Sequence, residues 1–153
     1  HTEEVPAFLP DRFEPGTPNI PGILGLHAAL SDLEKTSMEE SFQHEMKLTQ
    51  EFIDGIQALD PFEKNIRIIG KKNTSDRCAV VSLQTLQPDM SMVAYELDST
   101  YSIMTRVGLH CAPSAHKTFS TYPSGTIRFS FGPKNTSREV ETTLDALKKI
   151  CFI

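Results

Sequence analysis

The sequence predicts an α/β fold of the α+β type, in which helices pack on a small, mainly antiparallel sheet. Apolar residues recur at helical spacing in four segments, two β-rich runs flank a polar turn, and one later segment alternates apolar and polar residues. The chain has 153 residues, of which 39% are hydrophobic and 23% charged. These values are typical of a globular domain with its own packed core.

The N-terminal region is expected to be extended at first and then helical. Its first 22 residues include prolines at positions 6, 10, 15, 18 and 21, which exclude a regular helix there. From Gly22 onwards apolar side chains fall at helical spacing, which predicts a helix that ends near Lys35. Ser37 and Glu40 form a capping-box pattern that predicts the start of a second helix. The predicted apolar face of this second helix is Phe42, Met46, Thr49, Ile53 and Ile56.

The middle of the chain predicts a hairpin and a third helix. Residues 65–69 and 78–85 are apolar and rich in β-branched residues, and they flank the polar turn 70–76. We therefore expect two antiparallel strands. Pro88 and Asp89 suit the first turn of a helix. The apolar side of that helix carries Val93, Leu97 and Tyr101.

The C-terminal third is expected to contribute two strands and the last helix. A short strand is predicted over residues 103–106, and an irregular stretch follows over 107–125. Residues 126–131 alternate apolar and polar side chains, which predicts a strand with Arg128 on the face opposite the apolar residues. A capping-box pattern at residues 136–139 marks the start of the last helix. That helix is predicted to bury Val140, Leu144, Leu147 and Cys151.

Charge and composition exclude several classes of partner. The net charge is −5 and no basic stripe is present, so nucleic acid is not an expected partner. No apolar run approaches the roughly 20 residues that cross a bilayer, so no membrane association is expected. Three cysteines without regular spacing argue against a disulfide framework. We expect a cytoplasmic protein, because free thiols are typical of a reducing compartment.

Cys111 is the most informative candidate for chemistry. It lies in the segment Arg-Val-Gly-Leu-His-Cys-Ala-Pro, between two predicted strands and close to a cation and an imidazole. A thiol in such a setting can ionise readily and act as a nucleophile. The alternative is a small buried hydrophobic residue, which Cys78 and Cys151 also fit. His110, Cys111 and His116 lack a second ligand pair at zinc spacing, so no metal site is expected.

Two further groups of residues suit the binding of anions. Arg106 and Arg128 each carry a guanidinium that can hold a carboxylate through two hydrogen bonds, although a surface ion pair is the alternative. Gly16 and Thr17 lie just before the first predicted helix, where an anion can bind main-chain amides and a hydroxyl. The alternative there is an ordinary turn rich in proline and glycine.

Three stretches, taken in order, resemble the cysteine desulfurase and selenocysteine lyase branch of the class V, fold type I enzymes that depend on pyridoxal 5′-phosphate (PLP). Residues 12–20, Arg-Phe-Glu-Pro-Gly-Thr-Pro-Asn-Ile, are similar to the family segment that leads into a helix. Residues 105–113, Thr-Arg-Val-Gly-Leu-His-Cys-Ala-Pro, resemble its reactive-cysteine loop. Residues 126–136, Thr-Ile-Arg-Phe-Ser-Phe-Gly-Pro-Lys-Asn-Thr, resemble the strand and helix entry that close its C-terminal domain.

The resemblance implies a role for each candidate residue. Cys111 is expected to attack the sulfur of PLP-bound L-cysteine, which leaves L-alanine and an enzyme persulfide. Arg128 is expected to hold the substrate carboxylate, with Arg106 assisting. Thr17, with Gly16, is expected to reach the cofactor phosphate of the other subunit of a homodimer. The persulfide sulfur would pass to an acceptor protein.

The resemblance also implies that the chain is the C-terminal part of a longer enzyme. Residues 1–35 would complete the large PLP domain of the same protein, and residues 36–153 would form the small C-terminal domain. The Schiff-base lysine belongs to the large domain, so this chain alone is expected to be inactive. Two alternatives are a class V aminotransferase in which Cys111 is a bystander and a non-catalytic module derived from this domain.

Overall fold

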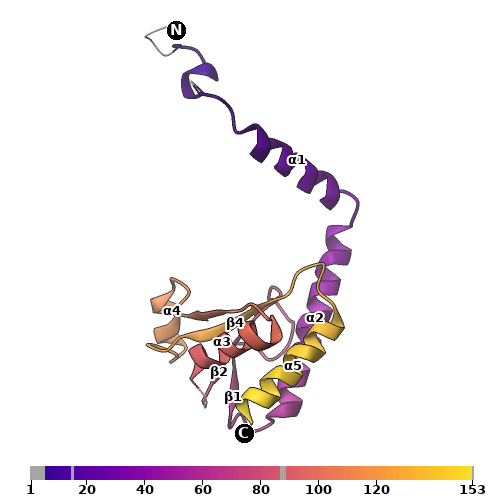
Figure 1. The fold of residues 1–153 in the computed structure, drawn as a ribbon, viewed down its shortest axis with the longest axis vertical. Coiled ribbons are helices and arrows are strands. Elements are labelled where there is room, and N and C mark those ends of the chain that lie inside the picture. Colours follow the sequence, from indigo (N-terminus) through magenta and orange to yellow (C-terminus); the bar gives the residue numbers. More distant parts are fainter. Residues whose placement is uncertain (1–5, 15, 87–88, 153) are drawn as a thin grey trace. The chain divides into compact units, whose positions relative to one another are not determined.

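The computed structural model describes residues 6–14, 16–86 and 89–152. By its contacts the chain divides into two units, residues 1–38 and residues 39–153. Figure 1 shows both units as a ribbon and labels most of their helices and strands.

The first unit contains one short 3-10 turn and one α-helix. The turn η1 (Asp11–Phe13) is followed by helix α1 (Ile20–Leu33). The predicted first helix is therefore confirmed, although it begins before Gly22 and ends before Lys35. Asn19 explains the earlier start, because its side chain accepts a hydrogen bond from the Gly22 amide at 3.1 Å and so caps the helix.

The surface of α1 is unusually apolar for a helix exposed to solvent. None of the residues in this helix is buried. A broad apolar stripe normally faces a protein core, so this surface is suited to packing against further protein. No helix among the described residues combines the length and apolar character needed to span a membrane. The exposed apolar side chains of α1 are Ile20, Ile23, Leu24, Leu26, Leu30 and Leu33.

The second unit is built on a four-stranded sheet. Its strands are β1 (Ile66–Ile69), β2 (Val80–Thr85), β3 (Arg106–Gly108) and β4 (Thr126–Ser130), arranged in the order β1-β2-β4-β3. Every neighbouring pair is antiparallel. The predicted hairpin is confirmed as β1 and β2, and the predicted alternating strand is confirmed as β4.

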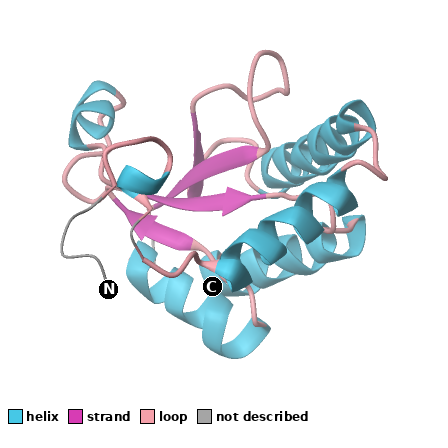
Figure 2. Ribbon diagram, turned by 90° about the horizontal axis from the view of Figure 1, so that it is seen from above, coloured by secondary structure: helices cyan, strands magenta, loops and turns pink. Residues whose placement is uncertain are grey.

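Three long helices cover one face of this sheet (Figure 2). They are α2 (Met38–Leu59), α3 (Met90–Tyr101) and α5 (Ser137–Cys151). The capping box predicted at residues 136–139 is present at the start of α5. Pro88, which was expected in the first turn of α3, lies outside the described residues. The arrangement confirms the predicted fold class of helices on a small antiparallel sheet.

The hydrophobic core lies between the sheet and these helices. Val81 of β2 and Ile127 and Phe129 of β4 point into it, as the alternation of each strand requires. Phe52 of α2 packs against Phe129, with 4.9 Å between the ring centroids. Arg128 consequently lies on the outer face of the sheet, opposite the core, as predicted.

The strand predicted over residues 103–106 is wrong in position, because β3 begins only at Arg106. Ser102 adopts a left-handed conformation with φ of 56° and ends α3. The Ile103 amide donates to the Leu97 carbonyl at 2.8 Å. Since this amide is used in closing the helix, it cannot pair with a neighbouring strand.

Four other predictions need correction. The stretch 107–125 is not irregular throughout, since it contains β3 and helix α4 (Pro113–Thr118), which is too short to show helical periodicity. Phe42 is 45% exposed because it lies in the first turns of α2, before the part that reaches the core. Leu144 is only partly buried. Cys78 is exposed and precedes β2, because the hairpin loop is longer than expected.

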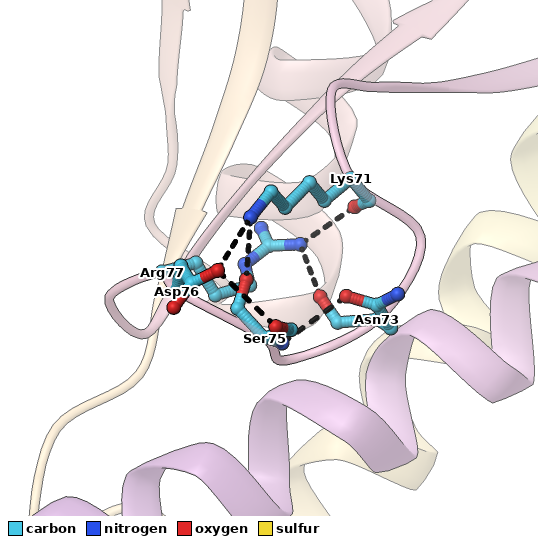
Figure 3. A network of polar contacts seen from close by, with 5 residues as sticks. All are labelled: Lys71, Asn73, Ser75, Asp76 and Arg77. Carbon is cyan, nitrogen blue, oxygen red and sulfur yellow. Dashed lines mark hydrogen bonds and ion pairs between the residues drawn. The ribbon is translucent and has the colours of Figure 1, made fainter.

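The loop between β1 and β2 is held by polar contacts among its own residues (Figure 3). Arg77 donates to the carbonyl oxygens of Lys71 at 2.7 Å and Asn73 at 3.3 Å. Lys71 forms an ion pair with Asp76 at 3.2 Å. The Asn73 side chain accepts a hydrogen bond from the Ser75 amide at 3.1 Å. The loop therefore satisfies its main-chain groups locally, as turns rich in Asn, Asp and Ser commonly do.

Asp60 joins the end of α2 to the start of β1. Its carboxylate accepts hydrogen bonds from the amides of Lys64 at 3.0 Å, Asn65 at 2.5 Å and Ile66 at 2.9 Å. Burial by itself would raise the pKa of Asp60, but these three hydrogen bonds and the charge of Lys64 outweigh it and lower the pKa. The carboxylate is therefore stabilised in its charged form.

We expect Asp60→Ala to reduce the free energy of unfolding by about 2 kcal/mol, because it leaves these amides without their partner. The folded pKa lies below the unfolded value of about 3.9, so the contribution is complete above that pH and is lost as the pH falls through the folded pKa. Chemical denaturation of the wild type and the variant at several pH values measures the difference. A difference that stays constant through the acidic range would contradict the assignment.

Candidate functional site

The pairing of β3 with β4 places two predicted site residues opposite each other. Arg106 is the cross-strand partner of Arg128, and Ser82 of β2 pairs with Arg128 on its other side. Arg106 is exposed and Arg128 is half-buried. Among the described residues neither arginine takes part in an ion pair. Since like charges directly opposite each other are unfavourable, this pair is suited to holding an anion.

Cys111 follows β3 in a tight turn and its side chain is exposed. His110 and Cys111 both have left-handed backbones, with φ of 50° and 59°. The turn is closed by the Ala112 amide, which donates to the Leu109 carbonyl at 2.8 Å. A left-handed residue other than glycine costs roughly 1–2 kcal/mol, so two in succession require support from their surroundings.

Helix α4 and the segment after it supply part of that support. His116, on α4, is 8% exposed, and its Nδ1 lies 2.7 Å from the Thr121 hydroxyl. The His116 carbonyl accepts a hydrogen bond from the Thr121 amide at 2.9 Å. The His116 amide donates to the Ala112 carbonyl at 3.2 Å, next to Cys111. The turn that carries the thiol is thus joined to a buried polar contact.

His110 connects the cysteine turn to the sheet. Its Nε2 lies 3.2 Å from the Thr126 hydroxyl, and its ring centroid is 5.8 Å from that of His116. Its Nδ1 is buried and has no hydrogen-bond partner among the described residues. Burial lowers the pKa of His110, as do the charges of Arg128, His116 and Arg106, against a smaller opposing effect of the Thr126 main chain. At neutral pH this imidazole is therefore mainly uncharged.

Two glycines allow the end of β3 to approach the segment before β4. Gly108 and Gly125 have φ of 105° and 81°. A Cβ placed on Gly125 would lie 2.2 Å from the carbonyl carbon and oxygen of Gly108. No other residue type fits at position 125, because a side chain would meet main-chain atoms that cannot move aside.

The predicted phosphate-binding residues lie in the first unit. Gly16 and Thr17 are exposed and lie between η1 and α1. A Cβ on Gly16 would meet nothing within 4 Å. The main chain at this point is therefore open to a ligand, and a hydroxyl and amides are donors that suit a phosphate.

The structure brings together residues that sequence reasoning selected and others that it missed. Arg106 and Arg128 lie in one row across the sheet, and Cys111 follows the same strand as Arg106. Thr126 and Thr121 were missed, because a hydroxyl that anchors a histidine carries no pattern in the sequence. Gly125 was missed for the same reason, since its close neighbour is 17 residues away in the chain.

Comparison with known proteins identifies a family and several relatives of this chain. The family model described as aminotransferase class V matches residues 3–143. A probable cysteine desulfurase of Pyrococcus abyssi is 36% identical over 141 residues, which are 92% of this chain and 33% of that protein. A second, from Mycobacterium leprae, is 33% identical and covers 88% of this chain and 31% of that protein. The chain thus spans about a third of the length of these relatives.

Solved structures agree on the fold. The apo structure of a cysteine desulfurase from Thermococcus onnurineus matches with a TM-score of 0.81 and 34% identity, covering 94% of this chain and 34% of that one. A cysteine desulfurase from Escherichia coli matches with a TM-score of 0.68 at 23% identity, covering 88% and 31%. The second likeness concerns the fold alone.

The close approach of Gly125 to Gly108 predicts that the stability of the protein is sensitive to substitution of Gly125. We expect Gly125→Ala to destabilise the protein more than Gly70→Ala, by about 2 kcal/mol or more. Both positions have positive φ, of 81° and 94°, but a Cβ on Gly70 would meet nothing within 4 Å. Thermal and chemical denaturation of both variants measures the difference, and equal losses would contradict the close approach.

Proposed function

This chain belongs to the class V aminotransferase family, and from that premise we propose that it is the C-terminal part of a PLP-dependent cysteine desulfurase. The proposed reaction removes sulfur from L-cysteine and yields L-alanine and a persulfide on Cys111. The observation that carries the proposal is the placement of an exposed Cys111 directly after the strand whose Arg106 lies opposite Arg128. One site then offers both a nucleophile and a holder for an amino-acid carboxylate.

Arg128 is the proposed ligand of the substrate carboxylate, with Arg106 assisting. A guanidinium makes two parallel hydrogen bonds to a carboxylate, and the cross-strand pair presents two such groups in adjacent positions. The absence of an ion pair to either arginine among the described residues supports this role. The pair would fix the orientation of the substrate and so direct its thiol towards Cys111.

Cys111 is the proposed sulfur acceptor. Its thiolate attacks the substrate sulfur, an S–S bond forms, and the bond between that sulfur and the substrate Cβ breaks. Of the two thiol protons present at the start, one remains on the persulfide and the other ends in the methyl group of alanine. PLP, when bound, supplies the electron sink for this bond cleavage. The terminal sulfur would then pass to an acceptor protein.

Gly16 and Thr17 are the proposed contacts for the cofactor phosphate of the other subunit in a homodimer. The open main chain at Gly16 and the exposed hydroxyl of Thr17 are compatible with a phosphate. Residues 1–35 are proposed to complete a large PLP domain, which also provides the covalent lysine, and residues 36–153 to form the small domain. The exposed apolar stripe of α1 supports this division, because a large domain would cover it.

The first test is a pair of cysteine variants of the full-length protein. We expect Cys111→Ala to reduce alanine release from cysteine on the order of 100-fold or more, because the sulfur loses its acceptor. Cys78→Ala is the matched control, since that thiol is also exposed, and we expect it to retain activity. Alanine is quantified directly, and the persulfide is detected by peptide mass. Undiminished alanine release by Cys111→Ala would assign Cys111 a bystander role.

The second test concerns the carboxylate site. We expect Arg128→Lys to lower kcat/KM for cysteine roughly 10- to 100-fold, because an ammonium cannot reproduce two parallel hydrogen bonds. Arg67→Lys is the control, since Arg67 lies on the same outer face but donates to Gln84. Steady-state kinetics of both variants measures the effect. Equal losses in the two variants would remove Arg128 from the substrate site.

A further inference from the structure

The imidazole of His110 lies beside the proposed carboxylate site. Thr126 and Arg128 are two residues apart on β4, so their side chains share the outer face of the sheet. His110 is anchored to Thr126 through Nε2 at 3.2 Å. Arg106 is opposite Arg128, and Gly108, two residues before His110, is opposite Thr126. The register of the two strands therefore brings one imidazole next to two guanidinium groups.

The charged and titratable groups around His110 oppose its protonation. They are Arg128 from β4, Arg106 from β3 and His116 from α4. No carboxylate among the described residues forms an ion pair with His110. A ligand carboxylate between the arginines would be the first negative charge at this position. Such a charge would offset one of the two guanidinium charges and so reduce their opposition to the imidazolium.

We propose that binding of a carboxylate between Arg106 and Arg128 favours the uptake of a proton from solvent by His110, which makes His110 a positioning residue that links substrate binding to Cys111. The inference rests on the proposed function, because it takes the arginine pair as the carboxylate site. An imidazolium at His110 would place a positive charge on the residue next to Cys111 in the chain, a setting that suits a sulfur nucleophile. The nucleophile is thereby activated when substrate is present.

Titration of His110 by NMR tests the link without any turnover. The full-length protein is labelled with 13C at histidine Cε1, and the His110 signal is identified by its loss in His110→Gln. We expect the pKa of His110 to rise in Arg128→Gln and in Arg106→Gln, because each removes a cation. Arg67→Gln, which removes a cation elsewhere on the same face, should leave it unchanged. An unchanged pKa in both site variants would overturn the inference.

A second titration is carried out with propionate, a carboxylate that has neither an amine nor a thiol. We expect propionate to raise the pKa of His110 in the wild type and not in Arg128→Gln. A second sample labelled with 15N at arginine reports on the guanidinium groups. If propionate shifts the arginine side-chain signals but not the His110 titration, the link is overturned while the carboxylate site stands. If propionate shifts neither, the arginine pair is not a carboxylate site, and the inference falls with that part of the proposed function.

The effect on Cys111 is measured by the rate at which its thiol is alkylated. We expect propionate near neutral pH to accelerate the reaction of Cys111 with iodoacetamide in the wild type, and this acceleration to be lost in His110→Gln. Cys78 provides an internal control, because it is exposed but lies in the loop between β1 and β2. Equal acceleration at Cys111 in the wild type and in His110→Gln would exclude His110 as the linking residue.

Discussion

The antiparallel register of β3 against β4 is the constraint on which the candidate site depends. It sets Arg106 opposite Arg128 and Gly108 opposite Thr126. Because side chains alternate along a strand, a slip of one residue in β4 would turn Arg128 towards the core and expose Ile127. The burial of Ile127 and Phe129 therefore holds the guanidinium on the outer face. The same alternation of side chains along β4 therefore buries the core residues and sets the position of the pair of arginines.

The same register brings the cysteine turn close to the sheet. Gly108 and Gly125 meet where neither could carry a side chain without strain, and His110 is anchored to Thr126, the residue opposite Gly108. Left-handed backbone at His110 and Cys111 is unfavourable by itself, so the exposed thiol depends on these contacts for its position. The turn is thus ordered by its contacts, and it leaves the side chain of Cys111 exposed.

The two units of the chain differ in how far they bury their own apolar side chains. The second unit encloses its own core, with Phe52, Ile53 and Leu147 fully buried. The first unit exposes most of the apolar surface of α1, including Leu24 and Leu26. Since the chain spans about a third of its relatives' length, this surface has a natural explanation as an interface with the proposed large domain.

Apolar periodicity and capping patterns are local properties, and they were enough to predict helices α1, α2, α3 and α5, the hairpin and the alternating strand. The sequence also singled out Cys111, Arg106 and Arg128 as candidates, since thiols and guanidinium groups carry a recognisable chemistry wherever they lie. It did not determine that Arg106 and Arg128 are neighbours, because their residue numbers differ by 22 and only strand pairing joins them. The start of β3 was misplaced because the closure of α3 takes the Ile103 amide.

The surroundings of the Cys111 thiol follow from tertiary packing. The anchoring of His110 on Thr126 and of His116 on Thr121, and the approach of Gly125 to Gly108, join residues through contacts that leave no periodic signal. The physical reason is that hydrogen bonds and close main-chain contacts act over a few ångströms in space, whatever the separation along the chain. Local pattern therefore predicted most of the elements and the candidate reactive groups, and packing decided which of those groups lie close together.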